Sequence, residues 1–317
     1  MTRDLYHKRT RFERLYNMVL DNRALAWVLE RATRPLIAKP RPPRTFTPIV
    51  IVGPARSGTT LVYQYLAHRL SCCYITNLTN RFPRGVPMLD RLTRRFPHPP
   101  PSYTNALGRT PGLLGPSQAI TFWKLLYAPQ REDDPGLARN IILRLQEDRR
   151  APFLSKWQGH NPHIADLEIT FASPLFLHVT RQPGETARSI HDGWLRINQD
   201  PKTPLSSPTR SYPRIEGESI FHNACAYVAA ALHDLHHDLG RVAHAFPISY
   251  EAFCSDPEST LHRLITWNRE RNLAPLALRK GSQPVQAFPQ KRYPLTEIQP
   301  YVEAVAAFTQ QLKVNPS

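Results

Sequence analysis

Short apolar runs alternate along the chain with longer segments of helical periodicity. Residues 48–52 and 175–180 are apolar and rich in β-branched or large side chains, and each run predicts a parallel strand buried on both faces. Further short strands are expected at 152–156 and 247–250. Helical patterns are expected at 61–70, 135–149, 161–170, 185–196, 219–239 and 257–270. This alternation predicts a three-layer α/β/α fold with a central parallel sheet of about five strands.

The N-terminal region has a different pattern. Apolar residues at helical spacing between 10 and 34, with arginines on the opposite face, predict a basic amphipathic helix. Prolines between 35 and 43 are expected to end it and to form a stiff linker. We therefore divide the chain into residues 1–47 and a main domain at 48–317. The helix is expected to pack on its own domain, and peripheral contact with an anionic membrane is the alternative.

The composition adds charge to this picture. The chain of 317 residues carries a formal net charge of +16 and 32 prolines. Such a charge favours anionic ligands. Because no nucleic-acid-binding motif is present, we expect no nucleic acid to bind. The four cysteines form no CxxC pair, and no motif indicates a metal. Without a signal sequence or a membrane-length apolar run, we expect a cytoplasmic protein.

The first candidate site is Gly53-Pro-Ala-Arg-Ser-Gly-Thr-Thr60, between a predicted strand and a predicted helix. Main-chain N–H groups in such a loop bind anions, and the helix N-terminus adds its positive dipole end. Hydroxyl groups of Ser57, Thr59 and Thr60 can donate further hydrogen bonds. The spacing matches the nucleoside triphosphatase loop, but Thr59 replaces the lysine that neutralises the β- and γ-phosphates. A ligand with a 5′-phosphate and one further anionic group suits a loop that carries Arg56.

The second candidate site follows the strand at 175–180. Arg181 lies at the carboxyl end of that strand, and Ser189 comes eight residues later in the next predicted helix. Ligands of open α/β sheets bind at the carboxyl ends of strands, and an arginine there can bind a phosphate with two parallel hydrogen bonds. One site therefore suits the 5′ end of a nucleotide and the other a second phosphate.

The order Pro-x-Arg-Ser-Gly-Thr-Thr-Leu, then Arg-x-Pro with a serine eight residues on, resembles sulfotransferases that use 3′-phosphoadenosine 5′-phosphosulfate (PAPS). The resemblance implies sulfuryl transfer to a hydroxyl or amine, with 3′-phosphoadenosine 5′-phosphate (PAP) as product and no metal, on a fold of the type shared with phosphate-loop nucleotide kinases. Because animal Golgi members of the family carry a membrane anchor, it also implies a bacterial protein. It implies that the 5′-phosphosulfate binds Arg56, Ser57, Gly58, Thr59 and Thr60. By the same resemblance, Arg181 and Ser189 bind the 3′-phosphate. Gln182 departs from the Asp or Asn usual in the family.

The acceptor must also lose a proton. The resemblance implies a strand that ends in lysine, with a catalytic histidine shortly after it. Lys156 ends the strand expected at 152–156, and His160 follows four residues later instead of two. We therefore expect Lys156 to assist Arg56 at the departing phosphate and His160 to act as the base.

Two other residues are alternatives for the base. His163, in Asn-Pro-His, matches the pattern of related bacterial families. Asp90 is the only acidic residue between Glu30 and Glu132, the stretch where other members carry a glutamate base.

Two later strings also resemble the family. Residues 248–253 are similar to a structural segment, in which Glu251 would lie near the nucleotide end of the sheet. Arg279-Lys280-Gly281 is similar to a 3′-phosphate loop, but it follows 248–253 too closely and is interpreted as a coincidence.

The acceptor is expected to bind against residues 76–130 and 199–216. We interpret 71–150 and 199–216 as acceptor-side insertions, the latter a mobile loop. A saccharide, a lipid and a small metabolite all fit, and the sequence sets no oligomeric state. The alternative functions are a small-molecule kinase or nucleoside triphosphatase with a degenerate loop, and a basic protein that binds anionic polymers.

Overall fold

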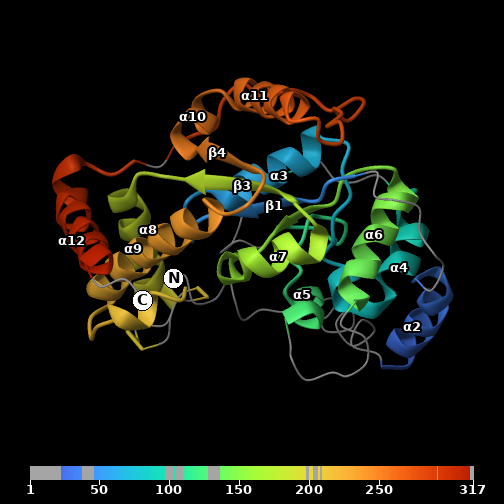
Figure 1. The fold of residues 1–317 in the computed structure, drawn as a ribbon, viewed down its shortest axis with the longest axis horizontal. Helices are drawn as coiled ribbons and strands as arrows, with labels where there is room; N and C mark the ends of the chain where they lie inside the picture. Colours follow the sequence, from blue (N-terminus) through green and yellow to red (C-terminus); the bar gives the residue numbers. More distant parts are fainter. Residues whose placement is uncertain are drawn as a thin grey trace.

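A central parallel sheet organises the chain (Figure 1). The computed structural model describes residues 23–37, 46–96, 101, 103, 110–127, 136–197, 200–202, 206–207, 209–290 and 292–314. Its strands are β1 (Ile49–Val52), β2 (Leu154–Lys156), β3 (Leu175–Thr180) and β4 (Ala245–Ser249), in the order β2-β1-β3-β4. All neighbouring strands are parallel. The predicted three-layer fold is confirmed, with four strands in the described residues where about five were expected.

Strand β1 shows why the centre of the sheet is apolar throughout. Ile49 and Ile51 pack into the core on one face of the sheet, and Val50 and Val52 pack into the core on the other. All four are at most 1% exposed. A parallel strand covered by helices on both faces needs an unbroken apolar run, which the sequence provides.

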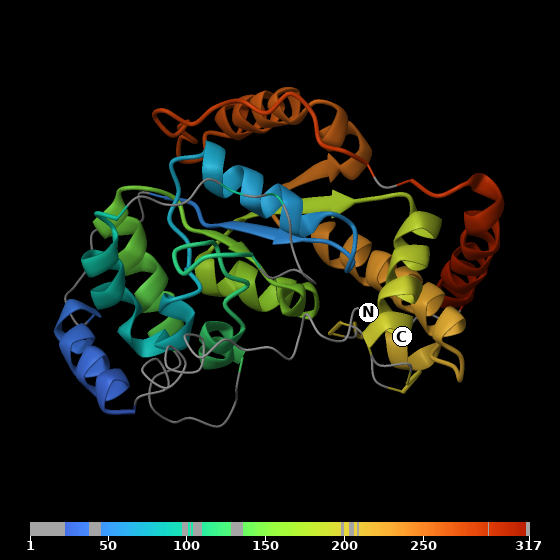
Figure 2. The same cartoon turned by 180° about the vertical axis from the view of Figure 1, so that it is seen from behind.

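Helices cover both faces of the sheet (Figures 1 and 2). One face carries α3 (Thr59–Arg69), α10 (Tyr250–Ser255) and α11 (Pro257–Glu270). The other face carries α4 (Val86–Thr93), α5 (Ile120–Tyr127), α6 (Leu137–Arg149) and α7 (Ile164–Phe171), with the end of α9 (Ile220–Leu239). A third cluster joins α9 to α8 (Pro183–Ile197) and α12 (Leu295–Val314). Short 3-10 turns are η1 (Thr79–Arg81), η2 (Pro83–Gly85), η3 (Gln158–His163) and η4 (Tyr212–Arg214).

The N-terminal helix differs from its predicted bounds. Helix α2 (Arg23–Ile37) lies at the far end of the molecule and packs Leu29 against Gly85. The expected stop at Pro35 is wrong, because Pro35 lies inside α2, which continues for two more residues to Ile37. Residues 10–22 of the predicted helix and 38–45 of the linker lie outside the described residues.

The segment at 199–216 was expected to be a mobile loop, and its described end is packed. Tyr212 and Ile215 are buried, and the main-chain N–H of Ser211 donates to Asp234 of α9 at 3.0 Å. Residues 199, 203–205 and 208 lie outside the described part. The prediction is therefore wrong for 209–216, because apolar residues among the prolines anchor that end on α9.

Strand β4 lies at one edge of the described sheet. Pro247, in the middle of β4, is exposed and lacks a main-chain N–H. Proline is tolerated in a sheet at such an edge, where one row of main-chain groups needs no partner strand.

The connections bring two loops together. The chain leaves β1 towards β2 on one side and returns to β3 on the other, so the loops after β1 and β3 meet at the point where the strand order reverses. Both strands point towards the end of the molecule where α8 and α12 lie (Figures 1 and 2). This is the usual ligand position in open α/β sheets. None of the helices in the described ranges is long and apolar enough to span a bilayer.

Candidate functional site

The loop after β1 is shaped by three residues with left-handed backbones. Gly53, Arg56 and Gly58 have φ angles of 152°, 66° and 96°. A β-carbon at Gly53 would strike the carbonyl oxygen of Val179, and one at Gly58 would strike the ring of Tyr250. The glycines therefore let the loop lie directly against β3 and α10, with its main chain turned towards the end of the sheet.

Side chains from distant segments hold this loop in place. Asn161 bonds both main-chain groups of Gly53: its amide donates to the carbonyl at 2.9 Å, and its oxygen accepts from the N–H at 3.3 Å. Gln158 donates to the hydroxyl of Thr59 at 3.2 Å. The phenol of Tyr227 accepts from the N–H of Ala55 at 3.4 Å. The loop is therefore pre-organised before any ligand binds.

The loop also contains an unused polar group. Ser57 is completely buried, and its hydroxyl has no hydrogen-bond partner among the described residues. Thr59 and Thr60 begin α3, so their main-chain N–H groups have no acceptor within the helix. A buried hydroxyl without a partner is costly, and an oxygen-rich anion would satisfy it.

The predicted Arg181 meets the same loop. One guanidinium nitrogen donates to the main-chain carbonyl of Arg56 at 3.4 Å. Two nitrogens donate to the carboxylate of Glu185, at 2.6 and 3.2 Å, and the guanidinium carbon lies 4.9 Å from the centre of the Tyr250 ring. Arg181 is therefore held at the loop by an internal carboxylate and an aromatic face.

Arg56 joins the two predicted half-sites. Its Nε donates to the hydroxyl of Ser189 at 3.2 Å. Burial within the site and the charges of Arg181 and Arg196 lower the pKa of Arg56. The positive charges of Arg56 and Arg181 thus lie at one loop, which favours a multiply charged anion.

The turn after β3 explains why glutamine is accepted at position 182, where the family usually has Asp or Asn. The side-chain oxygen of Gln182 accepts from the main-chain N–H of Glu185 at 2.5 Å, which caps the start of α8. Its own N–H donates to the carboxylate of Glu251 at 2.9 Å. Gln182 therefore performs the turn function expected of an Asp or Asn, and Glu251 lies where the sequence predicted.

Lys156 ends β2 beside the loop and is 3% exposed. Its amine donates to the side-chain oxygen of Gln118 at 3.2 Å. Burial and the nearby charge of Arg56 lower the pKa of Lys156 to about 7. The predicted pair of Lys156 and Arg56 therefore shares one electrostatic environment.

His160 does not face an open site, because its ring is buried and each ring nitrogen has a partner. It is fully buried, Ser155 Oγ lies 2.9 Å from its Nε2, and the Tyr127 hydroxyl lies 3.1 Å from its Nδ1. Burial, with the charges of His163 and Lys156, lowers the pKa of His160 to about 3. In this arrangement both ring nitrogens are engaged, and His160 ties the end of β2 to α5.

The alternatives for the base are also paired. His163 Nδ1 lies 2.8 Å from Asp166, and its ring stacks on Tyr127 at 4.0 Å between centres. Asp90 accepts two hydrogen bonds from Arg149, at 2.7 and 2.8 Å, and is 5% exposed. Its contacts join α4 to α6, so its position is that of a structural ion pair.

The comparisons with known proteins agree with this geometry. A family model described as "Sulfotransferase family" matches residues 48–269, which include the loop, Lys156, Arg181 and Ser189. The chain belongs to the sulfotransferase family. Among curated proteins, the comparison finds no match.

Solved sulfotransferases share the fold. STF1 from Mycobacterium tuberculosis has a TM-score of 0.55 and 14% sequence identity, over 91% of this chain and 82% of that chain. STF9 from Mycobacterium avium has a TM-score of 0.50 and 15% identity, over 92% of this chain and 73% of that chain. At such identities the likeness concerns the fold.

The structure separates Arg279 from the site of this sulfotransferase. The guanidinium of Arg279 donates to the carbonyl of Ala67, and its main-chain N–H donates to that of Arg69, at the end of α3 opposite Gly58. This supports the interpretation of Arg279-Lys280-Gly281 as a coincidence.

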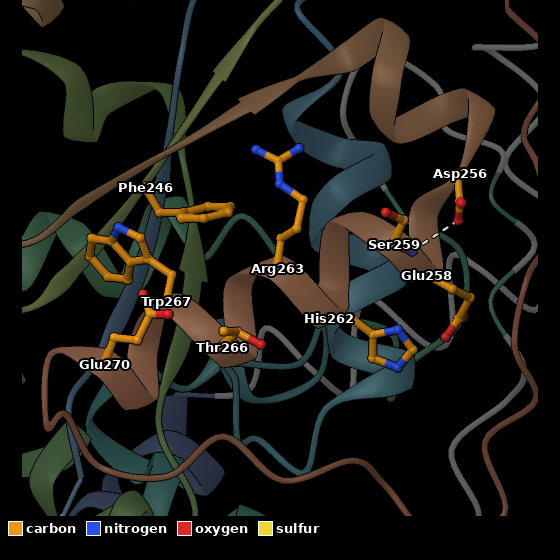
Figure 3. Close-up of a pocket in the computed structure, with 9 residues that line it drawn as sticks. All are labelled: Phe246, Asp256, Glu258, Ser259, His262, Arg263, Thr266, Trp267 and Glu270. Atoms are coloured by element: carbon orange, nitrogen blue, oxygen red, sulfur yellow. Dashed lines mark hydrogen bonds between the residues drawn. The ribbon is translucent and has the colours of Figure 1, made fainter.

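A groove of about 610 Å³ lies elsewhere on the sulfotransferase (Figure 3). It is lined by Phe246 of β4 and by Asp256, Glu258, Ser259, His262, Arg263, Thr266, Trp267 and Glu270 at α11. None of the predicted site residues lines it. Three carboxylates among its lining residues make it a poor site for the anion that the loop favours.

Sequence reasoning missed several contacts of the loop. Asn161, Gln118 and Tyr250 were not singled out, although they hold Gly53, Lys156 and Arg181. Asn161 carried a usable signal, because it follows Lys156 closely in the same segment. The described residues contain no cluster of His, Cys, Asp and Glu that could hold a metal ion.

Proposed function

We propose that this sulfotransferase transfers a sulfuryl group from PAPS to a hydroxyl or amine of its acceptor. The observation that carries the proposal is the hydrogen bond from Arg181 to the main-chain carbonyl of Arg56. It brings the loops after β1 and β3 into contact, which supports the binding of one nucleotide with anionic groups at both its 5′ and 3′ ends. The unused hydroxyl of Ser57 supports the fit.

The residues divide the binding work between two anionic groups. Ser57, the N-terminal N–H groups of α3 and Arg56 would hold the 5′-phosphosulfate, and Arg181 with Ser189 would hold the 3′-phosphate. Bound PAPS would supply an activated sulfuryl group and a phosphate leaving group. Arg56 and Lys156 would neutralise charge on the departing phosphate. A kinase function is less well supported, because Thr59 stands where a triphosphate would need lysine.

We propose that His160 takes the proton of the acceptor after one of its two ring contacts opens. Because Ser155 and Tyr127 engage both nitrogens of His160, a base role needs one of those contacts to open. His160→Gln should leave PAP binding within about threefold of wild type. It should abolish turnover if His160 is the base, whereas normal turnover would remove His160 from that role.

The experiment that tests the donor is a thermal-shift titration with PAP and, separately, with ATP and Mg²⁺. PAP at about 100 times its dissociation constant should add about 2.7 kcal/mol to the free energy of unfolding, and ATP-Mg should add little. Sulfated products identified by mass spectrometry, after incubation with PAPS and candidate saccharides, lipids or phenols, would identify the acceptor class. Stabilisation by ATP-Mg and not by PAP would refute the proposal.

A further inference from the structure

The amine of Lys156 is buried beside an anion loop without an acidic partner. It ends β2, is 3% exposed, and donates to the neutral side chain of Gln118. In the part of the chain that the structure describes, no carboxylate pairs with it. A buried ammonium normally needs a paired anion, so this arrangement suits a neutral amine until an anion arrives.

The titratable groups around Lys156 supply no negative charge. Arg56 faces it from the loop after β1 and carries a positive charge. His160 of η3 is neutral, since burial lowers its pKa to about 3. Tyr127 of α5, on the other side of His160, is a neutral phenol because burial raises its pKa. Burial and Arg56 together lower the pKa of Lys156 to about 7, so the amine is mostly uncharged above neutral pH.

Gln118 is held in position by a constrained turn. The hydroxyl of Ser117 accepts from the N–H of Ala119 at 3.1 Å, and the hydroxyl of Tyr63 donates to the carbonyl of Ser117 at 3.0 Å. The N–H of Ser117 donates to Ile75 at 2.8 Å. Ala119 has a left-handed φ of 56°, which costs a non-glycine residue roughly 1 kcal/mol. Such strain persists where the surroundings fix it, often at functional sites.

We propose that Lys156, positioned at the loop by Gln118, is a neutral amine in the free protein, and that binding of PAP or PAPS at the loop draws a proton from solvent onto Lys156. This rests on the proposed function, since the anion is the 5′ group of the nucleotide. On binding, the amine exchanges its contact with Gln118 for a phosphate oxygen, which favours its charged form.

The consequence is that nucleotide binding consumes a proton. At about pH 8, free PAP has completed the second ionisation of its phosphates, whose pKa is near 6, so the ligand contributes no proton change. With a pKa of about 7, Lys156 is then about 0.9 deprotonated in the free protein, and binding should take up about 0.9 proton.

The test is isothermal titration calorimetry of the full chain with PAP at about pH 8, in buffers that differ in ionisation enthalpy. The dependence of the measured heat on buffer gives the number of protons taken up. PAP is used because the reading requires no acceptor and no turnover.

Three variants identify the source of the proton. Lys156→Arg keeps a charge at all accessible pH values, so its uptake should fall to near zero. Gln118→Glu gives the amine a permanent carboxylate partner, so uptake should again fall to near zero and PAP affinity should fall about tenfold. Lys124→Arg, at an exposed position of α5, should keep the wild-type uptake. Unchanged melting temperatures would confirm that each variant is folded.

The outcomes separate the two proposals. Absence of PAP binding to the wild type would remove the proposed function, and this inference with it. Binding without proton uptake would overturn the inference alone. Wild-type uptake that persists in Lys156→Arg would exclude Lys156, and uptake that persists in Gln118→Glu would show that residue 118 does not position the amine.

Discussion

Arg181 donates a hydrogen bond to the main-chain carbonyl of Arg56 across 3.4 Å, joining two residues that are 125 positions apart. The contact brings the loops after β1 and β3 together at one end of the sheet. If these arginines lay on opposite sides of the molecule, one adenosine bisphosphate could not reach both. Since they touch, the functional test of each loop is the affinity for a single nucleotide.

Removal of the Arg181 side chain should weaken PAP binding strongly. Arg181→Ala loses two charge-assisted hydrogen bonds to a phosphate, and affinity should fall about 100-fold. Isothermal titration calorimetry measures the change. Arg263→Ala, at the exposed arginine of the α11 groove in Figure 3, is the matched control and should bind normally. A loss of less than about threefold for Arg181→Ala would contradict the assignment.

Glu185 should limit the affinity that Arg181 provides. Its carboxylate takes two hydrogen bonds from Arg181 and must share the guanidinium with any bound phosphate. Glu185→Gln removes this competing charge, so PAP should bind about three- to tenfold more tightly in a titration. Glu303→Gln, at an exposed position of α12, should have no effect. Weaker binding in Glu185→Gln would show that the carboxylate orients Arg181 instead of competing for it.

Ser57→Ala should separate stability from binding. The buried hydroxyl of Ser57 has no partner, so its removal should keep or raise the free energy of unfolding by about 1 kcal/mol, while PAP affinity falls about tenfold. Thr33→Val in α2 is a matched control, because the Thr33 hydroxyl is also buried without a partner. Urea unfolding and PAP titration measure both quantities. Equal PAP affinity in Ser57→Ala and wild type would exclude Ser57 from the site.

Alanine substitutions at two glycines can separate the cost of backbone strain from the cost of a steric clash. Gly58 and Gly281 both have left-handed φ angles, of 96° and 75°. A β-carbon at Gly58 strikes Tyr250, whereas one at Gly281 meets nothing. Gly281→Ala should therefore cost about 1 kcal/mol of stability, and Gly58→Ala should cost about 3 kcal/mol or more and abolish PAP binding. Similar losses of stability for the two variants would show that Tyr250 moves aside without cost.

His160 predicts a pH dependence of stability. Its pKa is lowered to about 3 in the folded protein by burial, against about 6.5 when unfolded, so the unfolded chain binds one more proton between these values. Stability contributed by neutral His160 is present above about pH 6.5 and is lost as pH falls, by about 1.4 kcal/mol per pH unit. His160→Gln should remove that slope in urea unfolding between about pH 4 and 6. An unchanged slope would mean that His160 is protonated in the fold.

Local sequence patterns predicted those parts of the site that are defined within a short stretch of chain. The strand at 49–52, the glycine loop after it and Arg181 at the end of β3 are each defined within about ten residues, and the structure brings the two arginines together as expected. The backbone needs of Gly53 and Gly58 are local too, although the groups they meet, Val179 and Tyr250, are not.

Contacts between distant segments were beyond sequence reasoning. Asn161 bonds Gly53 across 108 positions, and Gln118 bonds Lys156 across 38. His160 was expected near Lys156 from the family resemblance, despite a spacing of four residues instead of two, but the direction of its ring depends on Tyr127 and Ser155. Side-chain direction is fixed by packing, which a single sequence does not specify.

The exposed proline of β4 bears on the behaviour of this protein at high concentration. A strand from another molecule that approached that edge would find a donor missing at Pro247, midway along the row. The missing donor thereby discourages a strand of another molecule from pairing with the β4 edge of the sheet. A replacement that restores the N–H, such as Pro247→Val, would make β4 more regular and would promote aggregation through this edge.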